Sequence, residues 1–259
     1  MGLEAVDGAE SVQQAVGRRI GAGANVVKVF VDYRRRIMRS PPAQQHLYIP
    51  SVLHPPKEPN PDYLNFSQEE LNMAVAEAAL ARCPTAAHFG TLEGAHAAIN
   101  TGFDTIELVY FADEKLLESM ANKGCIFVPT QAVAERLHKR RFPQILAQAR
   151  LAYDRKVRLA CGGDTGTFSP RDNARELELM VEAGIPVEDV LEACTVGGWE
   201  TCRGDRCGIR FGWFEEGLRA DIIALNKDPM QHPDALRSVD LVIKDAKMWK
   251  VNGKTVEVI

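Results

Sequence analysis

The most restrictive feature of this chain is a regular alternation of short apolar runs with longer amphipathic segments. Five runs read as strands, at residues 25–32, 85–89, 104–110, 125–130 and 157–164. Each is followed, directly or after a loop, by a segment with helical periodicity. Strands that are apolar almost throughout are typical of parallel sheets covered by helices. The pattern therefore predicts an α/β fold with about five β/α units.

Local signals mark where the helices between these runs begin and end. Ser67 followed by Glu70 forms a capping box, which predicts a helix beginning at residue 68. Gly102 and Gly124 are expected to close the helices that precede the third and fourth strands. Residues 33–66 are rich in proline and show no period, so they predict a long loop, which could cover the strand ends and set specificity.

The character of the chain changes near residue 217. Short strand-like runs alternate with turn signals such as "NKDP" and "VNGK" up to the C-terminus. This pattern predicts a small antiparallel layer rather than further β/α units. We therefore expect one unit over residues 1–216 and a small β-segment over 217–259.

Charge and hydropathy limit the partners of the chain. A net charge of −4 gives no basic surface for nucleic acid. No apolar run is as long as a membrane span, and the first ten residues do not resemble a secretory signal. We expect a cytoplasmic protein with a small-molecule substrate and no membrane partner. A sheet of about five strands that stays open exposes its edges, which would favour a homo-oligomer.

The six cysteines are scattered through a chain of ordinary composition. Cys125 and Cys161 lie inside apolar runs, where a free thiol behaves as a small hydrophobic side chain. The spacing of Cys194, Cys202 and Cys207 matches no common zinc site. Six reduced thiols are therefore expected.

Polar residues interrupt or end the apolar runs, and chemistry in parallel β/α folds gathers at the carboxyl ends of strands. These residues are Lys28, Asp32, His88, Glu107, Thr130 and Asp164. Each alone has a structural explanation: a lysine whose amine reaches the rim, a hydrogen-bonded core histidine, a helix-capping aspartate. Together on successive strand ends, a lysine, a histidine and an aspartate could bind a divalent metal. The lysine would first need its charge removed, for example by carboxylation with CO₂.

Seven stretches of the chain carry a resemblance to a known family: "GANVVKVFVDYR", "FSQEELNMAVAEA", "TAAHFGTLEGAHAAINTGFDTIE", "GCIFVPT", "RLACGGDTGTF", "ELELMVEAGIPVEDVLEACTVGG" and "GWFEEGLRADIIALNKDP". In their order and spacing they resemble the amidohydrolase superfamily, in particular its imidazolonepropionase-like and prolidase-like group. The resemblance runs from about residue 8 to the C-terminus and implies a (β/α)₈ barrel of the TIM type beside a small β-sandwich. This chain would supply strands four to eight of the barrel and a remnant of the sandwich.

The resemblance also implies roles for single residues. Lys28 would be a carboxylated lysine that bridges two metal ions, and His88 would be the ligand from the fifth strand. Asp164 would be a ligand that also takes a proton from the attacking water. The metal would be zinc, with manganese or iron as alternatives. Tyr33 and Arg34, just past the lysine strand, could bind the substrate.

Two departures from the family pattern concern the same site. No His-x-His pair occurs, and His46 and His54 lie in the proline-rich segment. Leu108 stands where a histidine ligand should follow Glu107. Three of the six expected ligand positions remain, namely Lys28, His88 and Asp164.

Three interpretations of the chain are open. The first is a hydrolase of amide-type C–N bonds in dipeptides or other small molecules, which uses metal-activated water. The second is a truncated or degenerate relative, acting as a binding protein or as a metal-free acid–base catalyst. The third makes Met1 an internal methionine of a longer chain.

Overall fold

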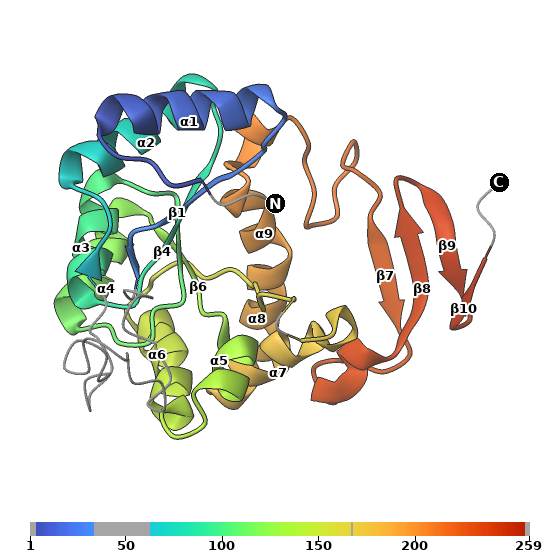
Figure 1. Ribbon diagram of the computed structural model, residues 1–259. Helices are drawn as coiled ribbons and strands as arrows, with labels where there is room; N and C mark the ends of the chain where they lie inside the picture. Colours follow the sequence, from blue (N-terminus) through green and yellow to red (C-terminus); the bar gives the residue numbers. More distant parts are fainter. Residues whose placement is uncertain (1–3, 34–62, 167, 257–259) are drawn as a thin grey trace, which may run out of the picture.

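The computed structural model describes residues 4–33, 63–166 and 168–256. Its centre is a parallel sheet with the strand order β1-β4-β5-β6 (Figure 1). The strands are β1 (Val27–Phe30), β4 (Thr85–His88), β5 (Thr105–Glu107) and β6 (Ile126–Val128). Two short strands, β2 (Asp32–Tyr33) and β3 (Tyr63–Leu64), pair antiparallel beside it. The first four predicted strands are therefore confirmed.

Helices follow the strands in the predicted alternation. They are α1 (Ala9–Gly21), α2 (Gln68–Leu80), α3 (Leu92–Thr101), α4 (Glu114–Lys123), α5 (Gln131–Leu137), α6 (Phe142–Asp154), α7 (Ala174–Glu182), α8 (Val187–Cys194) and α9 (Val196–Thr201). Short 3₁₀ turns are η3 (Pro170–Asp172), η4 (Gly204–Cys207) and η5 (Pro233–Arg237). Within the described part of the chain, no helix is both long and apolar enough to traverse a bilayer.

Helix ends follow the sequence signals. The Ser67 hydroxyl accepts a hydrogen bond from the Glu70 amide, and the Glu70 carboxylate accepts one from the Ser67 amide, so the predicted capping box is present. Gly102 and Gly124 end α3 and α4 with φ of 90° and 66°. Glycine takes this left-handed conformation without the steric penalty of a Cβ, which explains both helix ends.

The two faces of the parallel sheet have different environments. Side chains on one face, including Val29, Ala87, Ile106 and Phe127, pack with the helices in one large core. On the other face, Ile126 and Val128 form a small separate cluster with Ala160. Because neighbouring residues of a strand point to opposite faces, this division follows directly from the strand register. The second face is where the candidate site lies.

One sequence prediction about a strand needs correction. The expected strand at 157–164 is reduced to one parallel bridge, between Phe127 and Leu159, with hydrogen bonds from Phe127 N to Arg158 O and from Ala160 N to Phe127 O. Gly162 and Gly163 follow directly, and glycine weakens strand pairing. The helical region expected after the run at 125–130 is present and consists of two helices, α5 and α6.

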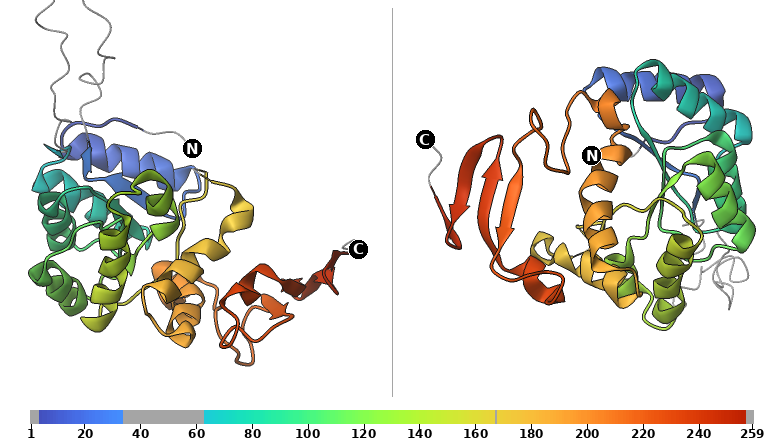
Figure 2. Two further views of the ribbon diagram at one scale, coloured as in Figure 1. Left: turned by 90° about the horizontal axis from the view of Figure 1, so that it is seen from below. Right: turned by 180° about the vertical axis from the view of Figure 1, so that it is seen from behind.

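A second sheet stands to one side of the helices and the parallel sheet (Figures 1 and 2). Its antiparallel strands are β7 (Ile222–Leu225), β8 (Val239–Lys244), β9 (Lys247–Val251) and β10 (Lys254–Thr255), in the order β10-β9-β8-β7. The antiparallel arrangement agrees with the sequence pattern. Every residue of these strands is half-buried or exposed, so no described layer fully covers either face of this sheet.

Candidate functional site

Strand register brings three of the predicted site residues onto one face of the parallel sheet. Phe30 pairs with His88, His88 with Glu107, and Glu107 with Val128. Lys28 lies two residues before Phe30 on β1, so it shares that face. Lys28, His88 and Glu107 therefore project from the face opposite the main helical core.

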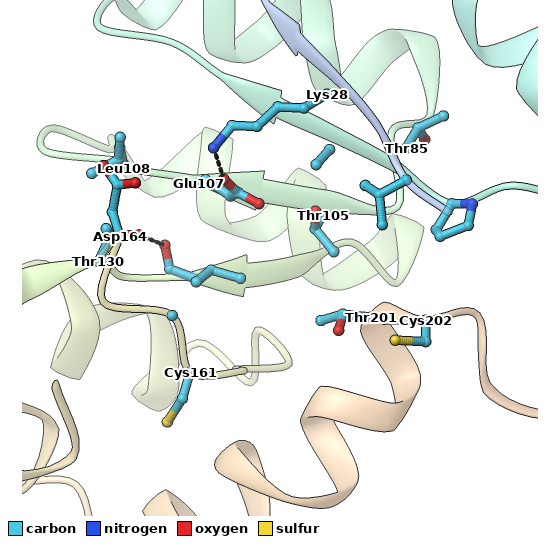
Figure 3. A pocket seen from close by; sticks show the side chains of 15 residues that line it. Lys28, Thr85, Thr105, Glu107, Leu108, Thr130, Cys161, Asp164, Thr201 and Cys202 are labelled. Carbon is cyan, nitrogen blue, oxygen red and sulfur yellow. Dashed lines mark hydrogen bonds and ion pairs between the residues drawn. The ribbon is translucent and has the colours of Figure 1, made fainter. Parts of the chain in front are cut away.

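A cavity of about 220 Å³ lies along this face (Figure 3). Strand residues form one wall, and residues at and after the end of α9 line it from the other side. The lining residues with polar side chains are Lys28, Thr85, Thr105, Glu107, Thr130, Cys161, Asp164, Thr201 and Cys202, and Leu108 is among the apolar ones. The cavity thus collects most of the polar strand ends predicted from the sequence.

Lys28 and Glu107 form an ion pair across the sheet, from β1 to β5. Their side chains keep 39% and 22% of their surface exposed, so solvent screens the pair. Exposed pairs of this kind contribute roughly 0.2–1 kcal/mol to stability. The pair therefore adds little to the stability of the fold.

His88 belongs to the same face but is not among the residues that line the cavity. Its ring packs against Phe30, with 4.8 Å between the ring centroids. Burial lowers the pKa of His88, and the positive charge of Lys28 lowers it further, although the Asp32, Glu107 and Asp164 carboxylates act in the opposite direction. Since its ordinary pKa already lies below 7, His88 is a neutral imidazole at that pH.

Asp164 lines the cavity from the loop that follows Gly162 and Gly163. Its φ of 55° is left-handed, a conformation that aspartate adopts more readily than most residues. A Cβ on Gly162 would lie 2.8 Å from Cγ1 of Val128, so the glycine lets the loop approach β6. The glycine pair that ends the predicted strand thus places the carboxylate at the cavity.

Leu108 occupies the position where the resemblance implies a histidine ligand. It is 6% exposed, lines the cavity, and has a left-handed φ of 66°. Its backbone amide donates to the Val128 carbonyl at 3.3 Å. An isobutyl side chain offers no lone pair to a metal, so this position contributes shape and apolar surface only.

The donor set does not fit the two-metal site that the resemblance implies. No group of three histidine, cysteine, aspartate or glutamate side chains suited to a metal ion exists among residues 4–33, 63–166 and 168–256. Lys28 is paired with Glu107, and Leu108 has no donor atom. His46 and His54 lie outside the described residues, as does Arg34, whereas Tyr33 is placed in β2.

The prediction of six reduced thiols is wrong for one pair. Cys161, which lines the cavity, is joined by a disulfide to Cys194 at the end of α8. The two Cα atoms lie 4.8 Å apart, and both cysteines pack against the main core. A separation of 33 residues gave no sequence signal for this pairing. Cys83, Cys125, Cys202 and Cys207 are free thiols.

Sequence reasoning missed Glu176, a carboxylate in α7 that is 1% exposed. It accepts hydrogen bonds from the amides of Gln131 at 2.9 Å and Ala132 at 2.7 Å, at the start of α5. These contacts hold the turn that begins with Thr130, a cavity-lining residue with φ of 54°. Helical spacing places Glu176 on the same face as the buried Leu179 and Met180, which is the signal that could have found it.

Replacing Glu176 by glutamine should change how stability depends on pH. Burial raises the pKa of Glu176 to about 7, against the opposing effect of the backbone amides. The folded state therefore holds a proton that the unfolded state releases near pH 4.5, and this stabilisation is lost as pH rises through about 7. Between pH 5 and 8, the free energy of unfolding of the wild type should fall relative to Glu176→Gln, by at most roughly 3 kcal/mol.

Glu178→Gln is the matched control for this measurement, which uses urea unfolding at each pH. Glu178 lies on the same helix, but hydrogen bonds from Arg237 lower its pKa. Its stabilisation should therefore be lost as pH falls, the opposite direction from Glu176. Parallel pH profiles for the wild type and Glu176→Gln would contradict the prediction.

Most of this chain is similar in sequence to a known protein family. Residues 58–256 match the amidohydrolase family. Curated relatives include ochratoxinase of Aspergillus niger, 32% identical over 267 residues, which cover 95% of this chain and 51% of the relative. The chain thus spans about half the length of the curated relatives it matches.

Solved structures of similar proteins have the same fold over the length of this chain. The crystal structure of A. niger ochratoxinase has a TM-score of 0.78 and 29% identity, and the match covers 96% of this chain and 56% of that one. A Xaa-Pro dipeptidase with bound methionine has a TM-score of 0.75 and 28% identity, over 95% of this chain and 59% of that one. The parallel sheet and its helices are therefore arranged as in these enzymes.

Proposed function

Because the chain belongs to the amidohydrolase family, we propose that it hydrolyses an amide-type C–N bond in a small molecule. The observation that carries the proposal is the cavity on the open face of the parallel sheet, where Lys28, Glu107 and Asp164 gather in a chain related to ochratoxinase. A cavity of about 220 Å³ suits a small ligand rather than a folded protein.

The similar proteins support a substrate class. They include an ochratoxinase and a Xaa-Pro dipeptidase. We infer that this chain acts on dipeptides or other small amides, and that Tyr33 and Arg34 contribute to substrate binding.

In this reaction Asp164 acts as the general base. It accepts a proton from the attacking water and passes it to the leaving nitrogen, so that the amine departs as a neutral group. The described donor set does not fit a pair of metal ions. The family leads us to expect zinc, manganese or iron, but no step of this reaction is assigned to a metal.

A second candidate function is favoured by the substitution at the ligand position. Leu108 and the Lys28–Glu107 ion pair agree with a degenerate family member that binds a small molecule, or catalyses acid–base chemistry, without metal. The two candidates share the cavity and differ in whether a C–N bond is broken.

The fold supports a matching proposal about architecture. We infer that the parallel sheet and the segment at 157–164 correspond to strands four to eight of a (β/α)₈ barrel, and that 217–259 is a remnant of the adjoining β-sandwich. The match to barrel-type neighbours over nearly the whole chain, with only about half of their length covered, supports this interpretation.

The test uses the purified full chain with ochratoxin A and L-methionyl-L-proline, each with and without added zinc. Hydrolysis is followed by mass spectrometry of the released amino acid, and metal is measured by elemental analysis of the same samples. Release that depends on the chain supports the first candidate. Binding of either compound in calorimetry without any release would overturn it and favour the second.

A further inference from the structure

Lys28 differs chemically from a metal-bridging lysine, because a carboxylated lysine is an anion and an ordinary lysine is a cation with three hydrogen-bond donors. We propose that Lys28 is an unmodified ammonium held by Glu107, and that it donates a hydrogen bond to a carbonyl oxygen of an amide ligand in the cavity. The ligand class rests on the proposed function, whereas the chemical state of Lys28 does not.

The contacts around Nζ favour the ammonium. Glu107 on β5 forms an ion pair with Lys28 on β1, and the Phe30 ring centroid lies 5.9 Å from Nζ. Both a carboxylate and the face of an aromatic ring attract a cation. A carbamate at the same place would set a second negative charge beside Glu107, which is unfavourable.

Compensation for that repulsion would have to come from metal ions, and the described residues offer no group of three histidine, cysteine, aspartate or glutamate side chains to hold one. Leu108 faces the cavity with an apolar side chain, and His88 packs against Phe30 outside the cavity lining. Thr105 and Thr130 add neutral hydroxyls to the cavity lining, and Asp164 adds a second carboxylate in addition to that of Glu107. The surroundings of Lys28 are thus those of an ion pair rather than of a metal bridge.

The ion pair leaves Lys28 able to contact a ligand. Glu107 accepts one hydrogen bond, so up to two of the three ammonium donors remain. The Lys28 side chain is 39% exposed and lines the cavity. An oxygen that becomes negative during attack on an amide carbonyl would be stabilised by such a donor, which is the usual role of an oxyanion-binding group.

The first part of the test concerns the state of Lys28. The full chain is expressed with zinc and bicarbonate, and ¹³C NMR is recorded in ¹³C-bicarbonate for the wild type and Lys28→Arg. We expect the wild type and Lys28→Arg to give the same spectrum, with no carbamate signal that depends on Lys28. We also expect the wild type to hold well below one metal ion per chain. A carbamate signal lost in Lys28→Arg, or stoichiometric metal lost in that variant, would overturn the proposal.

The second part concerns the ligand, with L-methionyl-L-proline as the probe in the presence of a chelator. Lys28→Met should weaken binding by about tenfold, the loss typical of one hydrogen bond to a charged group, whereas Lys28→Arg should retain most of it. Lys115→Met, on the exposed side of α4, is the matched control and should bind like the wild type. Thermal melts verify that each variant folds.

The outcomes separate this proposal from the proposed function. Binding that depends on Lys28, without hydrolysis, would overturn the hydrolase and support the ammonium site. Equal binding by the wild type and Lys28→Met, or no binding by the wild type, would overturn the ligand assignment whatever the result for hydrolysis. The substitution Leu108→His in the wild-type chain should leave its metal content low, because a single new imidazole does not release Lys28 from Glu107.

Discussion

Asp164→Asn is expected to lower kcat for hydrolysis of a dipeptide or other small amide by about 10²–10⁴-fold, the range typical for loss of a general base. An amide side chain has nearly the shape of the carboxylate but cannot take the proton of the attacking water. Asparagine also tolerates the left-handed φ of 55° found at this position, so the loop should keep its conformation. The measurement is kcat and KM on the compound that the wild type hydrolyses.

Asp245→Asn is a matched control, because Asp245 has a similar left-handed φ of 52°. It lies in the turn between β8 and β9, where its carboxylate pairs with Arg219 at 2.7 Å, and it does not line the cavity. Its substitution should leave kcat unchanged. If Asp164→Asn keeps the wild-type kcat, Asp164 is not the base and the proton must go to another group at the cavity.

The sequence predicted the positions of the site residues better than their interactions. Strand ends are readable because apolar runs stop at polar residues, and the parallel register then brings Lys28, His88 and Glu107 to one face. Which side chains touch depends on tertiary distances that no spacing contains. The Lys28–Glu107 ion pair joins residues 79 apart in the chain, and the proposal that Lys28 is an ammonium starts from this contact.

Two other features show why part of the fold was missed. The run at 157–164 has the composition of a strand, yet among the described residues it pairs with β6 through a single bridge, and it contains two glycines. Glu176 reads as an ordinary polar residue of an amphipathic helix, although it is buried against the start of α5. In both cases a neighbour distant in sequence decides the outcome.

The largest stability effect should come from Gly94→Ala in the first turn of α3. In an ordinary helix this change is stabilising, by roughly 0.5–1 kcal/mol. Here a Cβ would lie 2.2 Å from Oδ2 of Asp32, 3.0 Å from its Cγ, and 3.1 Å from Cβ of Phe89. Asp32 cannot move aside cheaply, because it is 1% exposed and accepts hydrogen bonds from the Gly90 amide at 2.6 Å and from the amide and hydroxyl of Thr91.

Overpacking alone costs about 1–3 kcal/mol, and each buried donor left without a partner adds about 1–3 kcal/mol. We therefore expect Gly94→Ala to lower the free energy of unfolding by roughly 3 kcal/mol or more, measured by urea unfolding. Gly198→Ala is the matched control, since Gly198 also lies in a helix, α9, and a Cβ there meets nothing within 4 Å. That variant should be neutral or slightly stabilised, and equal effects at the two glycines would contradict the role assigned to Asp32. Because Asp32 fixes the loop that directly follows His88, Gly94→Ala should also disturb the Phe30–His88 packing, seen as a change in the His88 ring signals in NMR.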